Sequence, residues 1–333
     1  MMNKSKVVNN FEISVIILTY NRGNDLKKCL DSLTKQTFKN FEVIVIDNGS
    51  TDITERILEK YSAKVMRSLK KNKAYLRNLG VKNASGAIIA FIDDDAEAHP
   101  QWLENIIQAY SSDRSVGAVG GPAIVDGNQK MLNFYSLASK STLVYLLLRI
   151  YQTVIAGINI SYIGRFTSSG VYSIGGSLKQ SSSIKRLFSV DILSTCNASV
   201  RKNVVDLIGG FDQNFIYNHE DGDLFIRIKE KGYSILFSPR AIVYHHVNPN
   251  PQSRASPYYI GRDFGYFYTK DAKPLRVSWK IRKILNITLF NIFWIYQAIR
   301  LHNLSLLKTL IGFVDGFILA RQKIKTINNN TEI

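Results

Sequence analysis

The sequence is poor in cysteine and has no secretory-type apolar segment at its start. Two cysteines, Cys29 and Cys196, occur among 333 residues, without the CxxC spacing of a zinc site or the number that a disulfide framework needs. The opening stretch MMNKSKVVNNFE contains no apolar run of signal-peptide length. These absences predict a protein that stays in the reducing cytoplasm.

Acidic residues are also in deficit. Asp and Glu number 26 against 43 Lys and Arg, which gives a formal net charge of +17. Such an excess favours a polyanionic partner, which can be nucleic acid, anionic lipid or the phosphates of a nucleotide. A basic nucleic-acid-binding protein is therefore one hypothesis, but the sequence shows no recognisable nucleic-acid module. No GxGxxG follows the first predicted strand, which argues against a dinucleotide-dependent oxidoreductase.

Short apolar runs alternate with segments of helical period through the first half of the chain. The runs are ISVIIL (13–18), VIVI (43–46) and AIIAFI (87–92), and apolar residues recur at helical spacing at Leu26, Cys29, Leu30 and Leu33. This alternation is typical of βαβ units. The sequence predicts an α/β protein with a mostly parallel sheet flanked by helices.

The middle of the chain breaks this pattern and the pattern then returns. Residues 127–189 are rich in Ser, Gly and Tyr, and we interpret them as a variable insertion or flap. After them we expect a strand within 191–200, a helix near 201–208, a helix that begins at Glu220, and two strands within 232–246.

Four polar clusters follow apolar runs or begin a helix: TYNR (19–22), DNGSTD (47–52), DDD (93–95) and HED (219–221). Singly, each is explained by a turn or a helix cap. Together they predict a ligand site, because ligands bind at the carboxyl ends of the strands in an open parallel sheet. On an extended strand end, Asp93 and Asp95 are expected to point one way and Asp94 the other.

The segments SVIILTYNR, VIVIDNGSTD, NKAYLRNLG, FIDDDA, CNASVRK, GGFD and EDGDLFIRIKEKGY resemble glycosyltransferase family 2 over about residues 13–245. The resemblance implies the A-type nucleotide-sugar-binding fold. We divide the chain into a catalytic domain at 11–248 and a C-terminal helical region at 249–333.

The resemblance also implies the residues of the donor site. Thr19 and Tyr20, with Asp47, would hold a nucleotide base, uracil or thymine, and Asn21 is a further expected donor-binding residue. Arg77 would approach the base or the diphosphate, Asp93 the ribose, and Asp94 is grouped with them. Asp95 would bind the Mn²⁺ or Mg²⁺ that bridges the phosphates, since these ions prefer hard oxygen ligands. His245 is a second expected ligand, with a purely structural role as the alternative.

On the acceptor side, the resemblance makes Asp221 the general base that deprotonates the attacking hydroxyl, with inversion at the anomeric carbon. Glu220 and Asp212 are expected acceptor-binding residues. The implied activity is transfer from a UDP- or dTDP-sugar to a saccharide or lipid-linked acceptor in cell-surface glycan synthesis. A catalytically silent sugar-binding relative stays open as an alternative.

The last sixty residues carry two apolar stripes at helical spacing, 281–299 and 304–318. Between 273 and 325 there are ten Lys or Arg and one acid, Asp315. The longest uncharged run, 284–299, has 16 residues, fewer than the roughly 20 of a spanning helix. This region is expected to pack on the catalytic domain, to lie on anionic lipid at the inner face of the cell membrane, or to do both.

Overall fold

The structure is a computed structural model that describes residues 12–125, 162–173, 181, 184–246, 256–273 and 276–331, with side chains as far as 326. Most of the predicted insertion at 127–189 lies outside the described residues. The predicted domain boundary at 248–249 lies outside them as well.

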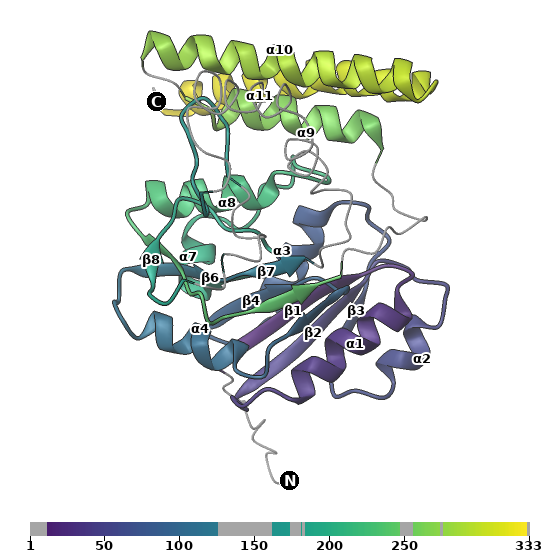
Figure 1. Cartoon of the computed structure of the whole chain (residues 1–333), viewed down its shortest axis with the longest axis vertical. Coiled ribbons are helices and arrows are strands. Elements are labelled where there is room, and N and C mark those ends of the chain that lie inside the picture. The colour runs from purple at the N-terminus through teal and green to yellow at the C-terminus, as the bar shows by residue number, and fades with distance from the viewer. Residues whose placement is uncertain are drawn as a thin grey trace, which may run out of the picture.

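An eight-stranded sheet forms the centre of the larger part of the molecule (Figure 1). Its order is β3-β2-β1-β4-β9-β6-β10-β8, in which β3, β2, β1 and β4 are parallel to one another and β6 is parallel to β10. Strand β9 runs antiparallel to both of its neighbours, and β8 runs antiparallel to β10. The strands are β1 (Ile13–Thr19), β2 (Phe41–Asp47), β3 (Lys64–Arg67), β4 (Ile88–Ile92), β6 (Val116–Gly120), β8 (Phe188–Ser189), β9 (Asn197–Arg201) and β10 (Ser234–Phe237).

Helices cover both faces of this sheet because its strands alternate between two cores. Ile13, Val15 and Ile17 of β1 pack with α1 and α4, whereas Ile16 packs with α3, α7 and α8 on the opposite face. The helices are α1 (Gly23–Thr34), α2 (Thr54–Leu58), α3 (Lys73–Asn83), α4 (Trp102–Tyr110), α7 (Lys202–Leu207) and α8 (Glu220–Glu230). The predicted mostly parallel, helix-flanked α/β sheet is confirmed.

A second sheet of three short strands brings the strand that ends at His245 next to the aspartate cluster. Its order is β5 (Ala96–Ala98), β11 (Val243–His245) and β7 (Ala123–Val125). Strand β11 is antiparallel to β5, and its register sets His245 opposite Ala96. The residue after Asp95 is therefore paired with His245, although almost 150 residues separate them in sequence.

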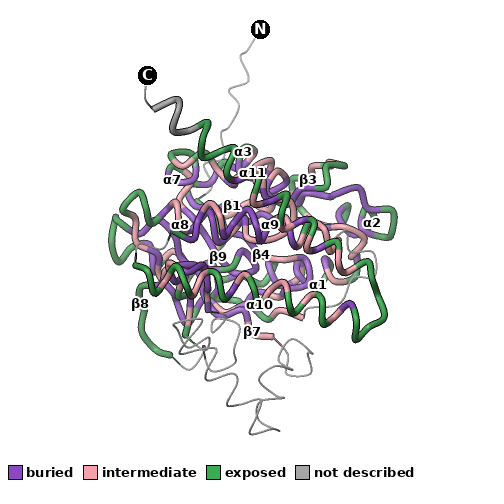
Figure 2. The backbone as a smooth tube through the Cα atoms, turned by 90° about the horizontal axis from the view of Figure 1, so that it is seen from above, coloured by how far each residue is buried: buried purple, intermediate pink, exposed green. Residues whose placement is uncertain are grey.

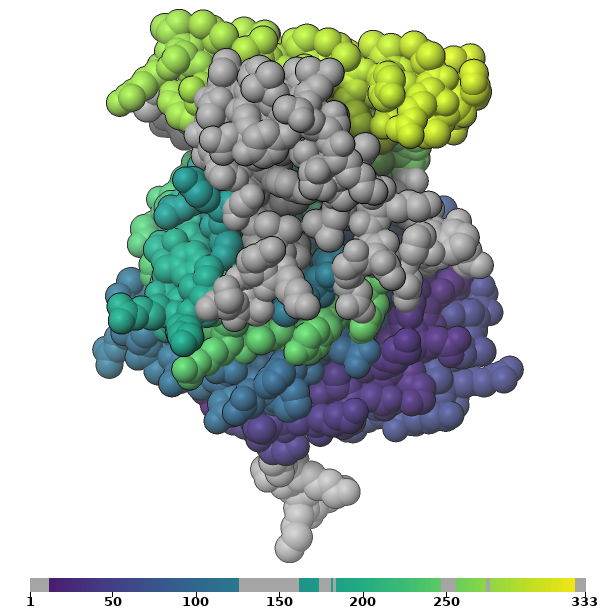
Figure 3. Space-filling model, in the orientation of Figure 1, coloured from purple at the N-terminus to yellow at the C-terminus, as the bar shows by residue number. Residues whose placement is uncertain are grey.

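Three long helices form a layer at one end of the molecule: α9 (Pro257–Lys270), α10 (Val277–Arg300) and α11 (Lys308–Thr331), with a 3₁₀ turn η5 (Leu304–Leu307) before α11. Figures 1 and 3 show this layer at the end away from α1 and α4. The two predicted stripes fall on α10 and on η5 with α11, so the helical appendage is confirmed. None of the described helices is both long and apolar enough to cross a bilayer.

Helices α9 and α11 approach so closely that only glycine fits between them. A Cβ on Gly261 would lie 1.8 Å from the carbonyl oxygen of Thr309, and a Cβ on Gly312 would lie 1.9 Å from that of Tyr258. Gly265 and Gly316 make equivalent contacts one turn along. In contrast, most of α10 is exposed or half-buried, as Figure 2 shows.

Candidate active site

A cavity of about 250 Å³ lies at the carboxyl ends of β1 and β4. Its walls carry most of the side chains that the sequence assigned to donor binding, together with the basic side chains of Arg22 and Lys73. The lining residues are Leu18, Thr19, Tyr20, Arg22, Asn48, Lys73, Leu76, Arg77, Asp93, Asp94, Asp95, Tyr217 and His245. Arg22, Lys73 and Tyr217 were not assigned a role from the sequence, because their place in the wall depends on loops that meet only in the fold.

Asn21 joins the loop after β1 to the loop after β2, whereas Asp47 makes a hydrogen bond within the loop after β2. Asn21 has a positive φ of 50°, and its side-chain oxygen accepts a hydrogen bond from the backbone N–H of Thr51 at 2.7 Å. Asp47 accepts from the backbone N–H of Ser50 at 2.8 Å. At the end of β2 it is the neighbouring Asn48 that lines the cavity. The base-binding role expected of Asp47 and the donor-binding role expected of Asn21 stay predictions.

The three aspartates form a turn rather than the extended strand end that the sequence suggested. Strand β4 ends at Ile92, and the backbone N–H of Ala96 donates to the carbonyl of Asp93 at 3.2 Å. Asp94 does not point away: both Asp94, at 3.5 Å, and Asp95 form ion pairs with Arg22. The strand-alternation argument for Asp94 was therefore wrong, because the chain turns before the alternation can apply. Burial raises the pKa of Asp94 to about 7, although Arg22 opposes this shift.

His245 faces the aspartates. Its Nε2 lies 3.0 Å from Oδ1 of Asp95 and 3.7 Å from Oδ2 of Asp93. Burial opposes protonation, but the hydrogen bond to Asp95 and the neighbouring acidic groups raise the pKa of His245 to about 11. His246 instead places its Nε2 2.8 Å from a carboxylate oxygen of Glu97. Of the two histidines, His245 is the one that lines the cavity.

A candidate cation site includes one residue that sequence reasoning missed. Ligand atoms of Asp93, Cys196 and His245 all lie within 4.8 Å of one another, and Asp95 contacts the same imidazole. Carboxylate, imidazole and thiolate groups are all metal ligands in proteins, so the residues present fit a divalent ion. The sequence signal for Cys196 was the CNASVRK segment, but a single cysteine without CxxC spacing gave no reason to assign it a ligand role.

Asp221 lies at a second cavity, also of about 250 Å³, which Tyr172, Ser194, Cys196 and Gly222 help to line. It sits in the first turn of α8, where its oxygens accept hydrogen bonds from the backbone N–H groups of Gly222 at 2.8 Å and Thr195 at 3.4 Å. Burial and the neighbouring charge of Glu220 raise the pKa of Asp221 to about 6. A carboxylate with this pKa can accept a proton near neutral pH.

Thr195 and Cys196 connect the two cavities. Thr195 donates to Asp221 on one side, and Cys196 approaches Asp93 and His245 on the other. The candidate base and the candidate cation site are thus adjacent through one short backbone segment. This arrangement suits a reaction in which an acceptor hydroxyl loses a proton beside a departing phosphate.

Glu220 pairs with Arg77, a residue of the first cavity's wall. It is only 4% exposed, and one of its carboxylate oxygens forms a buried ion pair with Arg77. Its other oxygen is buried and has no hydrogen-bond partner within the described part of the chain. In this position Glu220 holds the Arg77 guanidinium, and its expected acceptor-binding role stays a prediction.

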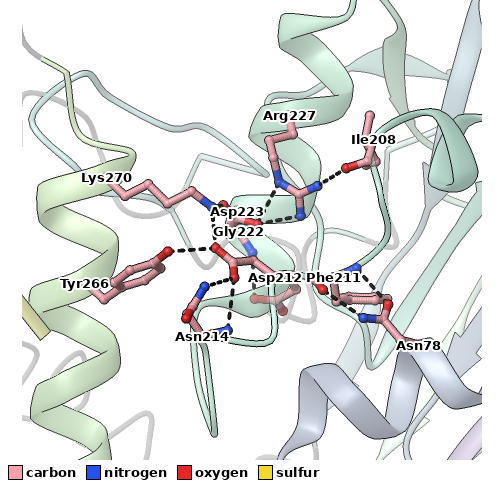
Figure 4. A network of polar contacts seen from close by, with 11 residues as sticks. Asn78, Ile208, Phe211, Asp212, Asn214, Gly222, Asp223, Arg227, Tyr266 and Lys270 are labelled. Carbon is pink, nitrogen blue, oxygen red and sulfur yellow. Dashed lines mark hydrogen bonds and ion pairs between the residues drawn. The ribbon is translucent and has the colours of Figure 1, made fainter. Parts of the chain in front are cut away.

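Asp212 faces helix α9, as Figure 4 shows. It accepts hydrogen bonds from Lys270 at 2.8 Å, Tyr266 at 2.9 Å and the side chain of Asn214 at 2.7 Å. Burial opposes it, but the Lys270 ammonium and these hydrogen bonds lower the pKa of Asp212 to about 2. These contacts account for Asp212 as an anchor of α9, while its predicted acceptor role is not tested by them.

Helix α9 also holds the loop that precedes Asp221. The carboxylate of Asp263 accepts hydrogen bonds from the backbone N–H groups of residues 216, 217 and 218 at 2.6–3.2 Å. His219 has a left-handed φ of 66°, and its ring stacks on that of Phe267 with centroids 4.8 Å apart. The C-terminal layer therefore contributes to the position of the candidate base.

Comparisons with known proteins show which proteins this chain resembles. Residues 14–163 match the family model described as Glycosyl transferase family 2. Glycosyltransferase AglE of Haloferax volcanii is 27% identical over 262 residues, which are 75% of this chain and 72% of AglE. Glycosyltransferase GlyA of Streptococcus pneumoniae serotype 4 is 38% identical over 114 residues, which are 32% of this chain but only 16% of GlyA.

Two solved structures share the fold. TarS 1-349 of S. aureus, in complex with UDP-GlcNAc, matches with a TM-score of 0.52 and 19% identity. This match covers 79% of this chain and 68% of the TarS chain. GalNAc-T7, with UDP, GalNAc and Mn²⁺, matches with a TM-score of 0.54 and 17% identity. This match covers 83% of this chain and 54% of the GalNAc-T7 chain. The resemblance stated from the sequence is confirmed.

Proposed function

On the premise that residues 14–163 are a glycosyl transferase family 2 region, we propose that this protein transfers a sugar from a UDP- or dTDP-sugar to an acceptor hydroxyl with inversion. The observation that carries the proposal is the pair of adjacent cavities, one with three aspartates, His245 and Arg77, and one with Asp221. Solved structures of this fold that bind UDP or UDP-GlcNAc support the choice of donor class.

In the proposed mechanism the first cavity binds the donor. Thr19 and Tyr20 lie in the wall where the base would sit, and Lys73 and Arg77 bring positive charge for the diphosphate. A Mn²⁺ or Mg²⁺ ion held by Asp95 and His245, with Asp93 beside them, would neutralise charge on the leaving phosphate. The cationic side chains and the aspartates together orient the diphosphate.

The second cavity is proposed to admit the acceptor hydroxyl. Asp221 takes the proton of this hydroxyl as its oxygen attacks the anomeric carbon, and the bond from that carbon to the β-phosphate oxygen breaks. Attack from the side opposite the leaving group inverts the anomeric configuration. Arg77 stays in place through its buried ion pair with Glu220 and helps to bind the departing nucleoside diphosphate.

A thermal-shift screen of UDP- and dTDP-sugars, with Mn²⁺ or Mg²⁺ and with EDTA, tests the donor. A donor that binds the folded state raises the melting temperature by mass action. Product analysis by NMR with an accepted sugar then gives the anomeric configuration. Donor binding without any transfer would instead support a catalytically silent sugar-binding relative.

We further propose that the acceptor is lipid-linked or membrane-proximal and that the protein works at the inner face of the cell membrane. Among the described residues, sixteen of the twenty-five exposed large hydrophobic side chains lie between Val277 and Ile324. The slightly longer stretch 273–325 carries ten basic residues against one acid. Exposed apolar side chains flanked by basic ones are typical of helices that lie on anionic lipid.

Flotation with anionic and neutral liposomes tests this surface. A variant with Ile284, Ile292 and Ile299 changed to Glu should lose binding, because these side chains are 53–67% exposed and are proposed to enter the lipid. The matched control is a variant with Leu207 and Val65 changed to Glu, because these side chains are exposed but lie outside the C-terminal helices. High salt should release part of the wild-type protein. Equal flotation of all three proteins would show that α10 does not bind lipid.

A further inference from the structure

We propose that Cys196 is a thiolate ligand of the divalent cation, together with His245 and Asp93, and that it makes the site prefer Co²⁺ and Zn²⁺ over Mg²⁺. The inference rests on the metal-dependent donor binding proposed above and deepens it. The juxtaposition that carries it is the approach of the three ligand atoms to within 4.8 Å of one another. These residues come from three segments that lie far apart in sequence.

The position of Cys196 is fixed by its neighbour Asn197. The side-chain amide of Asn197 donates to the carbonyl oxygens of Pro122 and Ala241, both at 2.7 Å, and its oxygen accepts from the indole N–H of Trp102 at 2.8 Å. Asn197 is 2% exposed, so all these bonds are made away from bulk water. The start of β9 is thereby held, and with it the sulfur of Cys196.

The other two ligands are equally constrained. His245 is the last residue of β11, which pairs with β5 immediately after the aspartate turn. Asp93 begins that turn and accepts a backbone hydrogen bond from Ala96. Three independent backbone constraints therefore converge on one small volume.

The ligand atoms lie somewhat farther apart than they would around a bound ion. Metal–nitrogen and metal–oxygen bonds of about 2.0–2.2 Å and a metal–sulfur bond of about 2.3 Å put neighbouring ligand atoms of a tetrahedral ion about 3.4–3.6 Å apart. The observed limit is 4.8 Å, so side-chain shifts of about 1 Å would close the site. Asp95, 3.0 Å from the same imidazole nitrogen, is available as a further oxygen ligand.

The donor set differs from an all-oxygen site in its selectivity. Mg²⁺ prefers carboxylate, phosphate and water oxygens and binds thiolate poorly, whereas thiolate and imidazole favour Co²⁺ and Zn²⁺. A mixed oxygen, nitrogen and sulfur site should bind these ions more tightly than Mn²⁺, and Mg²⁺ least tightly. On binding, the Cys196 thiol gives its proton to the solvent and the sulfur bonds to the metal, so one proton is released per ion at this residue.

The alternative is that Cys196 only packs against its neighbours and binds no metal ion. It is 7% exposed and its thiol lies 3.3 Å from the hydroxyl oxygen of Ser194, to which it donates. The alternative predicts no sulfur–metal bond and no change in ion preference when the sulfur is replaced. The two explanations therefore differ in a spectroscopic signal that does not depend on turnover.

The test is a Co²⁺ titration of the full-length protein with UDP present, followed by absorption in the near ultraviolet. We expect a sulfur-to-cobalt charge-transfer band that is absent from Cys196→Ser. The matched control is Cys29→Ala, because Cys29 is the chain's other cysteine and lies fully buried in the core under the sheet. This control should keep the band.

Calorimetric competition between Co²⁺ and Mg²⁺ gives the second measurement. Cys196→Ser should lose at least about tenfold in Co²⁺ affinity, with a smaller loss for Mg²⁺, and Cys196→Asp should shift the preference towards Mg²⁺. The Asp variant keeps the proposal testable if the Ser variant folds poorly.

Two results would overturn the proposal in different ways. Bound Co²⁺ without the charge-transfer band, or a band and ion preference unchanged by Cys196→Ser, would refute the thiolate ligand and leave the proposed donor binding intact. If the wild-type protein binds UDP equally well with Mn²⁺, Co²⁺ or EDTA and takes up no divalent ion, the metal dependence of the proposed function fails as well.

Discussion

Lys270 of α9 forms an ion pair with Asp223 of α8, two residues beyond Asp221 on the same helix. Asp223 is fully buried, and its other oxygen accepts from Arg227. Lys270 also bonds Asp212, so one ammonium joins the C-terminal layer to two segments of the candidate site (Figure 4). The layer is therefore part of the support of the candidate base.

Lys270→Met should lower the free energy of unfolding by about 1–3 kcal/mol, because it removes a charged partner from the buried Asp223 while Arg227 remains. Lys273→Met is the control, since the pair of Lys273 with Glu230 is exposed on both sides and should contribute less than about 1 kcal/mol. Urea unfolding of both variants measures the difference. Equal stability of the two variants would show that the Lys270 contact is not stabilising.

Asp221→Asn should keep donor affinity and reduce turnover by about two to four orders of magnitude, the usual scale for loss of a general base. The pKa of Asp221 is raised to about 6, and the active form is the deprotonated one. Wild-type kcat/KM should therefore be level above about pH 7 and fall about tenfold per pH unit below about pH 6.

The rate of the Asp221→Asn protein should lack this acid limb. Glu230→Gln, at the exposed end of the same helix, should show the wild-type rate and pH profile. Kinetics with the accepted donor between pH 5 and 8 measure both variants. Near-normal turnover of Asp221→Asn would assign the base to another residue.

Asp95→Ala should weaken UDP binding in Mn²⁺ by at least about tenfold and remove its sensitivity to EDTA, since a hard oxygen ligand is lost. Glu97→Gln is the control, because Glu97 lies two residues away and pairs with His246 instead. Isothermal calorimetry compares the two. If Asp95→Ala binds UDP as tightly as the wild type and still responds to EDTA, Asp95 is not a metal ligand.

Gly316→Ala should destabilise the C-terminal layer, because a Cβ there would lie 1.9 Å from the carbonyl oxygen of Arg262 and would force α9 and α11 apart. Overpacking of this kind costs about 1–3 kcal/mol. Val314→Ala, on the same helix but 52% exposed, should change stability by less than about 0.5 kcal/mol. Thermal unfolding of the full-length proteins measures both, and a Gly316→Ala protein as stable as Val314→Ala would contradict the close crossing.

Local sequence patterns determined the α/β class and most of the element order. The run 13–18 became β1, and Leu26, Cys29, Leu30 and Leu33 form the buried face of α1 as predicted. Such patterns depend on which face of one element meets the core, and that information lies in neighbouring residues. The polar clusters after β1 and β4 were likewise readable, because ligands collect at the carboxyl ends of strands.

The sequence did not predict how these clusters meet. Asp94 was misplaced, because one backbone turn after β4 replaced the expected extended strand end. Helix α9 falls within the helical region predicted at 249–333, but no apolar stripe was assigned to it, since its glycines weaken a helical pattern and make sense only against α11. Helix propensity can be read along the chain, but a close helix crossing cannot.

The sequence by itself thus determined which residue types stand at the strand ends. Only the tertiary structure decided that Cys196 and His245 approach Asp93, that Lys270 reaches Asp223, and that α10 lies largely exposed (Figure 2). The contacts at the candidate cation site and between Lys270 and Asp223 join residues that are between about 50 and 150 positions apart in the sequence. They follow from sheet order, strand register and helix crossing, which depend on the packing of the whole chain rather than on its local periodicity.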